Sequence, residues 1–268
     1  MAKCLVAGLP SAGKTTYIAA LSYLLRNPTE GQILYLKDIP NDISLINRLQ
    51  KPWLEQKIVD RTSRGKVTDL QLNIKRMTDQ KVINVNIPDI AGEDFTSILE
   101  KQCETINSWD EKPDSLLFFI KRIPTLVLKE SFADADTEDA HTTKAKIPNF
   151  TIRHIYEGTQ NVLLLKELRR LFPWKRIAIG LTSWDLHDSK EKPSEYLKRE
   201  CPFLSNFLNQ YFPEAYIFGI SAQGWEYDDK MDIDECMNKT MEGKRSYIIA
   251  PNGEKSYDIT IPLDYLIS

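Results

Sequence analysis

Close to the start of the 268-residue chain stands the stretch Gly8-Leu9-Pro10-Ser11-Ala12-Gly13-Lys14-Thr15-Thr16, which fits the pattern G-x-x-x-x-G-K-[ST]. In a loop of this kind, backbone N–H groups point at phosphate oxygens, the lysine reaches the β- and γ-phosphates, and the next hydroxyl holds Mg²⁺. The flanking residues fit as well, because Cys4 to Ala7 predicts a buried strand and Thr15 to Leu25 predicts a helix. This order favours a phosphate-binding loop over a glycine turn that matches by chance.

Strand and helix patterns alternate along the rest of the chain. Strands are predicted over residues 32–36, 67–74, 82–87, 115–120, 176–181 and 216–220, and the second and third of these suggest a hairpin. Helices are predicted over residues 43–58, 95–106, 157–171, 194–211 and 231–241, with breaks near Pro52 and Pro202. The alternation predicts an α/β fold, a three-layer P-loop NTPase sandwich whose sheet is mostly parallel with one antiparallel edge strand.

The chain is expected to form a single domain over residues 1–268, because it has no internal repeat and no sharp change in composition. Insertions are expected at about residues 31–60 and 124–156, and an irregular C-terminal extension at about residues 225–268. A last hairpin is predicted around Pro251-Asn252-Gly253-Glu254. The acidic stretch at residues 134–139 is interpreted as a solvated loop or as a segment that faces a partner.

Composition gives no reason to expect nucleic acid or a membrane as the main partner. The formal net charge is −3, and no apolar run approaches the ~20 residues of a membrane span. The four cysteines are scattered without a C-x-x-C pair, which argues against a metal site or a disulfide framework. The first strand begins almost at Met1 and leaves no room for a signal peptide, so a cytoplasmic protein is expected.

Three more polar motifs follow predicted strands, at the edge of the sheet where ligands of open α/β folds bind. They are Asp89-Ile90-Ala91-Gly92, Thr182-Ser183-Trp184-Asp185 and Ser221-Ala222-Gln223-Gly224. The Asp89 carboxylate suits a magnesium shell, and the Gly92 N–H suits a γ-phosphate. The Asp185 carboxylate can accept hydrogen bonds from N1–H and the 2-amino group of guanine, which adenine cannot offer. A backbone N–H of the last motif can bind the guanine O6.

Each motif also has a purely structural interpretation. Asp89 or Asp185 can cap a helix, and the turn at Ser221 can be an ordinary serine turn. Trp184 can be a core or a surface aromatic and needs no functional interpretation. The chain's three histidines are too dispersed to form a metal or catalytic cluster. The order of the motifs after the phosphate-binding loop favours the functional interpretation.

From Lys3 to Gly224, these motifs resemble those of P-loop GTPases of the translation-factor-related (TRAFAC) class, which have a Ras-like core. The first loop and Asp89-Ile90-Ala91-Gly92-Glu93 look like those of the bacterial double-GTPase group of predicted conflict and defence operons. The resemblance implies that Lys14 contacts the β- and γ-phosphates, that Thr15 and Asp89 hold Mg²⁺, and that Gly92 senses the γ-phosphate. It implies further nucleotide contacts from Gly8, Ser11, Ala12, Gly13, Thr16, Asp185, Ser221 and Ala222.

Three features depart from the family pattern. Thr-Ser-x-Asp replaces N-K-x-D, so the lysine along the guanine face and the asparagine that braces the loops are both absent. Glu93 occupies the position of the glutamine that orients the attacking water, and an ionised carboxylate cannot donate a hydrogen bond to the γ-phosphate. The threonine of switch I that binds Mg²⁺ has no firm sequence anchor. Thr62 is the candidate for it, and Thr68 is the alternative.

The sequence therefore predicts a Mg²⁺-dependent GTP-binding protein that hydrolyses GTP slowly to GDP and phosphate and acts as a switch for a protein partner. Lys14, Thr62, Gly92 and Glu93 are the predicted catalytic residues. A nucleotide-binding module with little or no hydrolysis is the first alternative, because of Glu93 and the altered base motif. A P-loop ATPase or kinase is the second.

Overall fold

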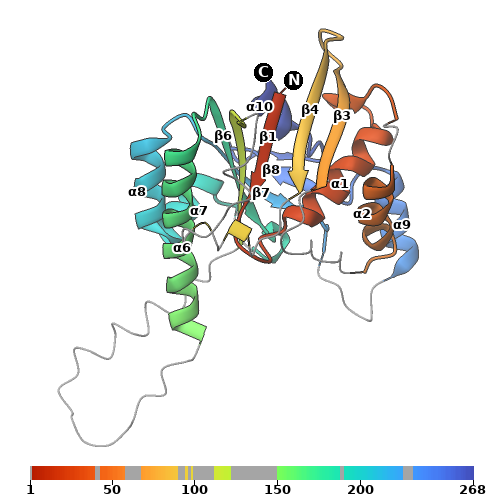
Figure 1. The fold of residues 1–268 in the computed structure, drawn as a ribbon. Coiled ribbons are helices and arrows are strands. Elements are labelled where there is room, and N and C mark those ends of the chain that lie inside the picture. Colours follow the sequence, from red (N-terminus) through yellow and green to blue (C-terminus); the bar gives the residue numbers. More distant parts are fainter. Residues whose placement is uncertain are drawn as a thin grey trace, which may run out of the picture.

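The structure is a computed structural model that describes residues 2–39, 43–57, 68–89, 94–95, 98, 112–121, 150–187, 190–225 and 232–268. One nine-stranded sheet forms its centre, in the order β2-β3-β4-β1-β5-β6-β7-β8-β9 (Figure 1). The strands are β1 (Ala2–Ala7), β2 (Leu34–Leu36), β3 (Thr68–Arg76), β4 (Val82–Asp89), β5 (Ser115–Ile120), β6 (Arg176–Thr182), β7 (Tyr216–Ser221), β8 (Tyr247–Ile249) and β9 (Lys255–Ser256). The described helices are α1 (Lys14–Arg26), α2 (Ser44–Leu54), α6 (Phe150–Leu171), α7 (Pro193–Glu200), α8 (Pro202–Tyr211), α9 (Ile233–Met241), α10 (Ile261–Ile267) and the short 3-10 helix η1 (Trp184–Leu186).

The middle of the sheet is parallel. Strands β4, β1, β5, β6 and β7 pair in parallel, so the residues that follow them gather at one edge of the sheet. Strands β3 and β8 run opposite to their neighbours and place antiparallel pairs on both sides of this parallel block. The predicted fold class and the hairpin of β3 and β4 are confirmed, and β8 with β9 adds a second antiparallel edge.

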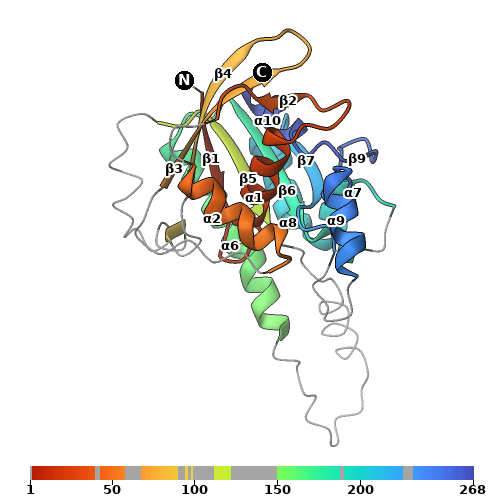
Figure 2. The same ribbon diagram turned by 90° about the vertical axis from the view of Figure 1, so that its right-hand side faces the viewer.

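Strand β5 shows why helices cover both faces of the sheet. All six of its residues are buried. Leu117 and Phe119 belong to a core cluster with residues of α1, α2 and α10, whereas Leu116 and Phe118 belong to one with residues of α6, α7 and α8. Successive side chains of a strand point to opposite faces, so such a strand needs an apolar cover on each. Figures 1 and 2 show the resulting three layers.

Helix boundaries follow the sequence pattern only in part. The predicted break at Pro202 is confirmed, because α7 and α8 are separate helices. Helix α2 contains Pro52 and ends at Leu54, short of the predicted residue 58. Helix α6 begins at Phe150 rather than near residue 157, so the predicted insertion 124–156 includes its first turns. Those turns project beyond the sheet (Figures 1 and 2).

Residues 225–268 are more regular than the predicted irregular extension, since they contain α9, β8, β9 and α10. Helix α10 lies at the amino ends of the central strands, where the Ser115 hydroxyl donates to Leu266 O at 3.1 Å. The Asp258 carboxylate accepts from Ile33 N at 2.7 Å and so ties residues 31–60 to this C-terminal region. The described parts of both segments therefore pack on the same body as the central strands.

Most of the predicted helix at residues 95–106 lies outside the described residues. Phe95 and Ile98 are helical and are buried in the same cluster as Leu116. Among the described helices, none combines the length and the apolar character that crossing a bilayer requires.

Candidate functional site

The predicted phosphate-binding loop connects β1 to α1. Gly8 and Gly13 have φ angles of 148° and 85°, which residues with a side chain rarely adopt. A Cβ on Gly8 would lie 2.5 Å from the Phe119 carbonyl oxygen, so the close approach of loop and β5 requires glycine there. Helix α1 begins directly after Gly13 and presents its N-terminal N–H groups at the end of the loop.

Lys14 is folded over the loop to which it belongs. Its Nζ donates to Gly8 O at 2.8 Å and to Leu9 O at 3.1 Å, and the residue is only 6% exposed. The ammonium group also lies 5.5 Å from the centre of the Phe95 ring. A buried cation needs such partners, and together they hold one positive charge at the centre of the loop.

A cavity of about 400 Å³ opens beside this loop. Its walls come from the loop and α1, from the segment after β6, and from the turn after β7. They consist of Ser11, Gly13, Thr16, Tyr17, Thr182, Ser183, Asp185, Leu186, Ile220, Ala222, Gln223 and Trp225. The volume lies in the range of cofactor and small-molecule sites. Three of the four sequence motifs thus meet at a single cavity.

Thr182 joins the segment after β6 to the phosphate-binding loop. Its hydroxyl donates to Ile120 O at 3.3 Å, and a Cβ on Gly13 would lie 3.2 Å from its methyl group. In the comparison with N-K-x-D, this residue stands at the position of the asparagine, and it packs against the phosphate-binding loop. Ser183 follows with a left-handed φ of 56° and turns the chain into η1, which brings the half-buried Asp185 to the cavity wall.

The carboxylate of Asp185 also acts on Tyr247 of β8. Burial raises the pKa of the Tyr247 phenol to about 12, and the charge of Asp185 adds to the rise. The negative charge at this end of the cavity is therefore close to the antiparallel edge formed by β8.

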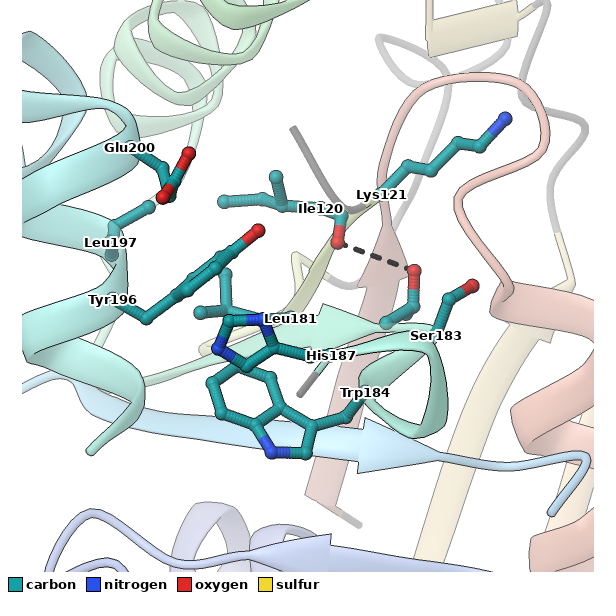
Figure 3. Close-up of a pocket in the computed structure, with 10 residues that line it drawn as sticks. Ile120, Lys121, Leu181, Ser183, Trp184, His187, Tyr196, Leu197 and Glu200 are labelled. Atoms are coloured by element: carbon teal, nitrogen blue, oxygen red, sulfur yellow. Dashed lines mark hydrogen bonds between the residues drawn. The ribbon is translucent and has the colours of Figure 1, made fainter. Parts of the chain in front are cut away.

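Trp184 is a core aromatic rather than a surface one. It is 5% exposed, its ring centre lies 4.7 Å from that of His187 and 5.3 Å from that of Tyr196, and Figure 3 shows the three rings grouped together. A Cβ on Gly219 would come within 2.3 Å of the indole, so the tryptophan lies directly on β7. A second cavity beside these rings measures about 10 Å³, the size of one water molecule.

The turn after β7 has a buried side and a side that faces the cavity. Ser221 is 1% exposed and its hydroxyl accepts from Gly224 N at 3.1 Å, so it shapes the turn from inside. Ala222 and Gln223 face the cavity. Of the two residues predicted to support a base, Ala222 therefore lines the cavity, and Ser221 lies behind it.

The remaining predicted positions are placed by the backbone or lie outside the described residues. Asp89 ends β4 next to β1 and pairs with Thr68 of β3, so both backbones lie at the edge of the sheet that carries the phosphate-binding loop. Gly8, Ala12, Lys14 and Thr15 belong to the loop without lining the cavity. Thr62, Gly92 and Glu93 lie outside the described residues.

Sequence reasoning missed several residues at the cavity. Tyr17 has the spacing of a core residue on α1 and gives no separate signal, although it lines the cavity and donates to Ile259 O at 3.1 Å. Leu186 and Trp225 directly follow two of the motifs. Extending each motif by one residue would have found them.

Comparison with known proteins yields a family and structural neighbours. The family model described as Double-GTPase 1 matches residues 5–266, and no curated protein matches. The chain is similar to the GDP-bound Roco2 RocCORdC of Methanosarcina barkeri, with 13% identity, a TM-score of 0.37, and coverage of 89% of this chain and 47% of that one. It therefore spans about half of the length of that chain. It is also similar to the G domain of the FeoB iron transporter of T. maritima, with 14% identity, a TM-score of 0.34, and coverage of 90% and 98%.

Proposed function

Because the chain belongs to the Double-GTPase 1 family, we propose that it is a Mg²⁺-dependent GTP-binding protein that hydrolyses GTP slowly and serves as a nucleotide-controlled switch. The observation that carries this proposal is the cavity of about 400 Å³ between the phosphate-binding loop, Asp185 and Ala222. A nucleoside triphosphate needs a site for phosphates at one end and a site for the base at the other. The sequence resemblance already implied this family, and membership of it favours guanine as the base.

The loop residues take the phosphate end. Lys14 supplies the cation for the β- and γ-phosphates, and the backbone of Gly8, Ser11, Ala12, Gly13 and Thr16 supplies N–H groups. Asp185 accepts the two guanine donors at the other end, and the turn that begins with Ser221 and Ala222 supplies a donor for O6. We treat residues 1–268 as one domain, since the described parts of residues 31–60 and 225–268 share a core cluster with the central strands.

The residues that would hold Mg²⁺ are Thr15, Asp89 and Thr62. Hydroxyl and carboxylate oxygens are the ligands that this ion prefers. Two observations support the fit: Thr15 is a half-buried residue in the first turn of α1, and β4 ends at Asp89 beside β1. When bound, the ion supplies positive charge to the β- and γ-phosphate oxygens.

Calorimetric titration with GDP, GTP and ATP, with and without Mg²⁺, tests the nucleotide class. We expect GTP and GDP to bind more tightly than ATP and Lys14→Ala to abolish GTP binding. Lys198→Ala is the matched control, because this lysine is exposed on α7 and does not line the cavity. Equal affinity for ATP and GTP would support the ATPase or kinase alternative instead.

Single-turnover cleavage of GTP tests the proposed slow hydrolysis. The Glu93 carboxylate cannot donate to the γ-phosphate and repels its charge, whereas the Gly92 N–H supplies a donor. We expect slow cleavage by the wild type and faster cleavage by Glu93→Gln, which restores a donor and removes the charge. Equal rates for the wild type, Glu93→Gln and Glu93→Ala would remove Glu93 from the mechanism. No detectable cleavage by any of them would favour the nucleotide-binding module.

The switch would act on a protein partner in the cytoplasm. Slow hydrolysis suits a partner that neutralises charge with an arginine, since such residues raise rates ~10³–10⁵-fold. Residues 31–60 and 124–156 are the proposed contact segments. Pull-down of the partner with GTP-loaded and GDP-loaded protein tests this point, and equal capture in both states would contradict it.

A further inference from the structure

The turn of Ser221 to Trp225 is held by residues that no nucleotide-binding motif contains. The indole Nε1 of Trp53, on α2, donates to Ala222 O at 3.2 Å. The Ser246 hydroxyl, just before β8, donates to the same oxygen at 2.6 Å. One carbonyl of the turn is thus fixed by two donors that are 169 and 24 residues away in sequence.

Arg245 fixes the next carbonyl and packs against the same indole. Its Nε donates to Gln223 O at 3.0 Å, and its guanidinium lies 3.8 Å from the centre of the Trp53 ring and 5.3 Å from that of Trp225. The residue is 3% exposed, so its charge depends on these contacts. A Cβ on Gly224 would lie 2.3 Å from Arg245 O, which shows how closely the two segments approach.

The contacts to Ala222 O determine where the Gln223 N–H points. In a trans peptide, the C=O and the following N–H point in opposite directions. With its carbonyl turned toward Trp53 and Ser246, the peptide after Ala222 directs the Gln223 N–H to the other side. Ala222 and Gln223 both line the cavity.

We propose that Trp53 and Arg245 are positioning residues for base recognition, which hold the turn of Ser221 to Trp225 so that the Gln223 N–H faces a guanine base. This inference rests on the proposed function and deepens it. The lysine and asparagine of N-K-x-D are absent from residues 182–185, so base selectivity depends more on how rigidly this turn is held. Trp53 also makes α2, in residues 31–60, part of the base site.

The test compares Trp53→Phe with Trp174→Phe in the full chain. Both indoles donate to a backbone carbonyl, Trp53 to Ala222 O at 3.2 Å and Trp174 to Leu168 O at 3.1 Å, and only the first contacts the turn. Phenylalanine keeps an aromatic face for Arg245 and removes the donor. Calorimetry with GDP and ADP gives the affinity and the guanine-to-adenine ratio.

We expect Trp53→Phe to weaken GDP binding about three- to tenfold, the range for one neutral hydrogen bond, and to leave ADP binding unchanged. Trp174→Phe should change neither. Ser246→Ala removes the second donor to Ala222 O and leaves the aromatic rings in place. It should also lower the ratio of GDP affinity to ADP affinity. An unchanged ratio in Trp53→Phe and Ser246→Ala would overturn this inference while the proposed function stands. A wild type that binds no GDP would overturn both.

Discussion

Replacement of Asp185 is the sharpest test of the base site. The carboxylate lies at the cavity wall in η1 and is half-buried. Hydrogen bonds to a charged acceptor contribute about 1.5–3 kcal/mol each, and partial exposure favours the lower value. Two such bonds to guanine therefore amount to about 3 kcal/mol, so Asp185→Ala should weaken GDP binding roughly 100-fold. ADP binding should change little, because adenine offers no pair of donors at this position.

The assay is competition of GDP and ADP against a fluorescent guanine nucleotide, at fixed Mg²⁺. Glu195→Ala is the control, since it removes an exposed carboxylate of α7 that does not line the cavity. Asp185→Asn should also weaken GDP binding, because its amide oxygen can accept from one guanine donor but its NH2 group cannot accept from the other. GDP affinity within twofold of the wild type in both Asp185 variants would refute the assignment of this residue to the base.

Three further predictions concern stability and reactivity. Gly8→Ala should lower the free energy of unfolding by about 2 kcal/mol or more in urea titrations, because its Cβ would lie 2.5 Å from the Phe119 oxygen. Gly31→Ala is the control and should lower that free energy less, because Gly31 has a φ of 81° but open space around it. Burial raises the pKa of Asp258 despite its hydrogen bonds, and a raised folded-state pKa stabilises most at low pH and less as the pH rises through it. The advantage of the wild type over Asp258→Asn in unfolding free energy should thus shrink as the pH rises above the ordinary Asp pKa of about 4, and a growing advantage would contradict this. Burial raises the pKa of Cys4 to about 12, so iodoacetamide should leave this thiol unmodified in the native protein and label it in urea, as mass spectrometry can show.

Local sequence patterns were enough to predict the parts of the fold that depend on residues close together in sequence. The glycines and Lys14 of the first loop must lie together because a tight turn between a strand and a helix allows little else. The apolar run of β5 predicted a strand with both faces covered. The turn at Asn252 and Gly253 predicted the last hairpin, whose strands are β8 and β9.

Boundaries that depend on distant packing were less predictable. The start of α6 at Phe150 was missed, because the sequence pattern of residues 124–150 is weak, and the first turns of the helix project from the sheet. The second antiparallel edge required knowing that β8 pairs with β7, a contact between segments separated by α9. Neither feature is encoded in a short stretch.

Short stretches of sequence were enough to predict the phosphate-binding loop, the order of the strands along the chain, and the polar motifs that follow them. The folded structure was needed to show that Gly13, Asp185 and Ala222 share one cavity, and that Trp53 and Arg245 hold the turn at its far wall. The difference lies in how far apart in sequence the interacting residues are. A loop motif is fixed by adjacent φ and ψ angles, whereas an indole on α2 reaches a carbonyl 169 residues away only after the sheet has brought both segments together.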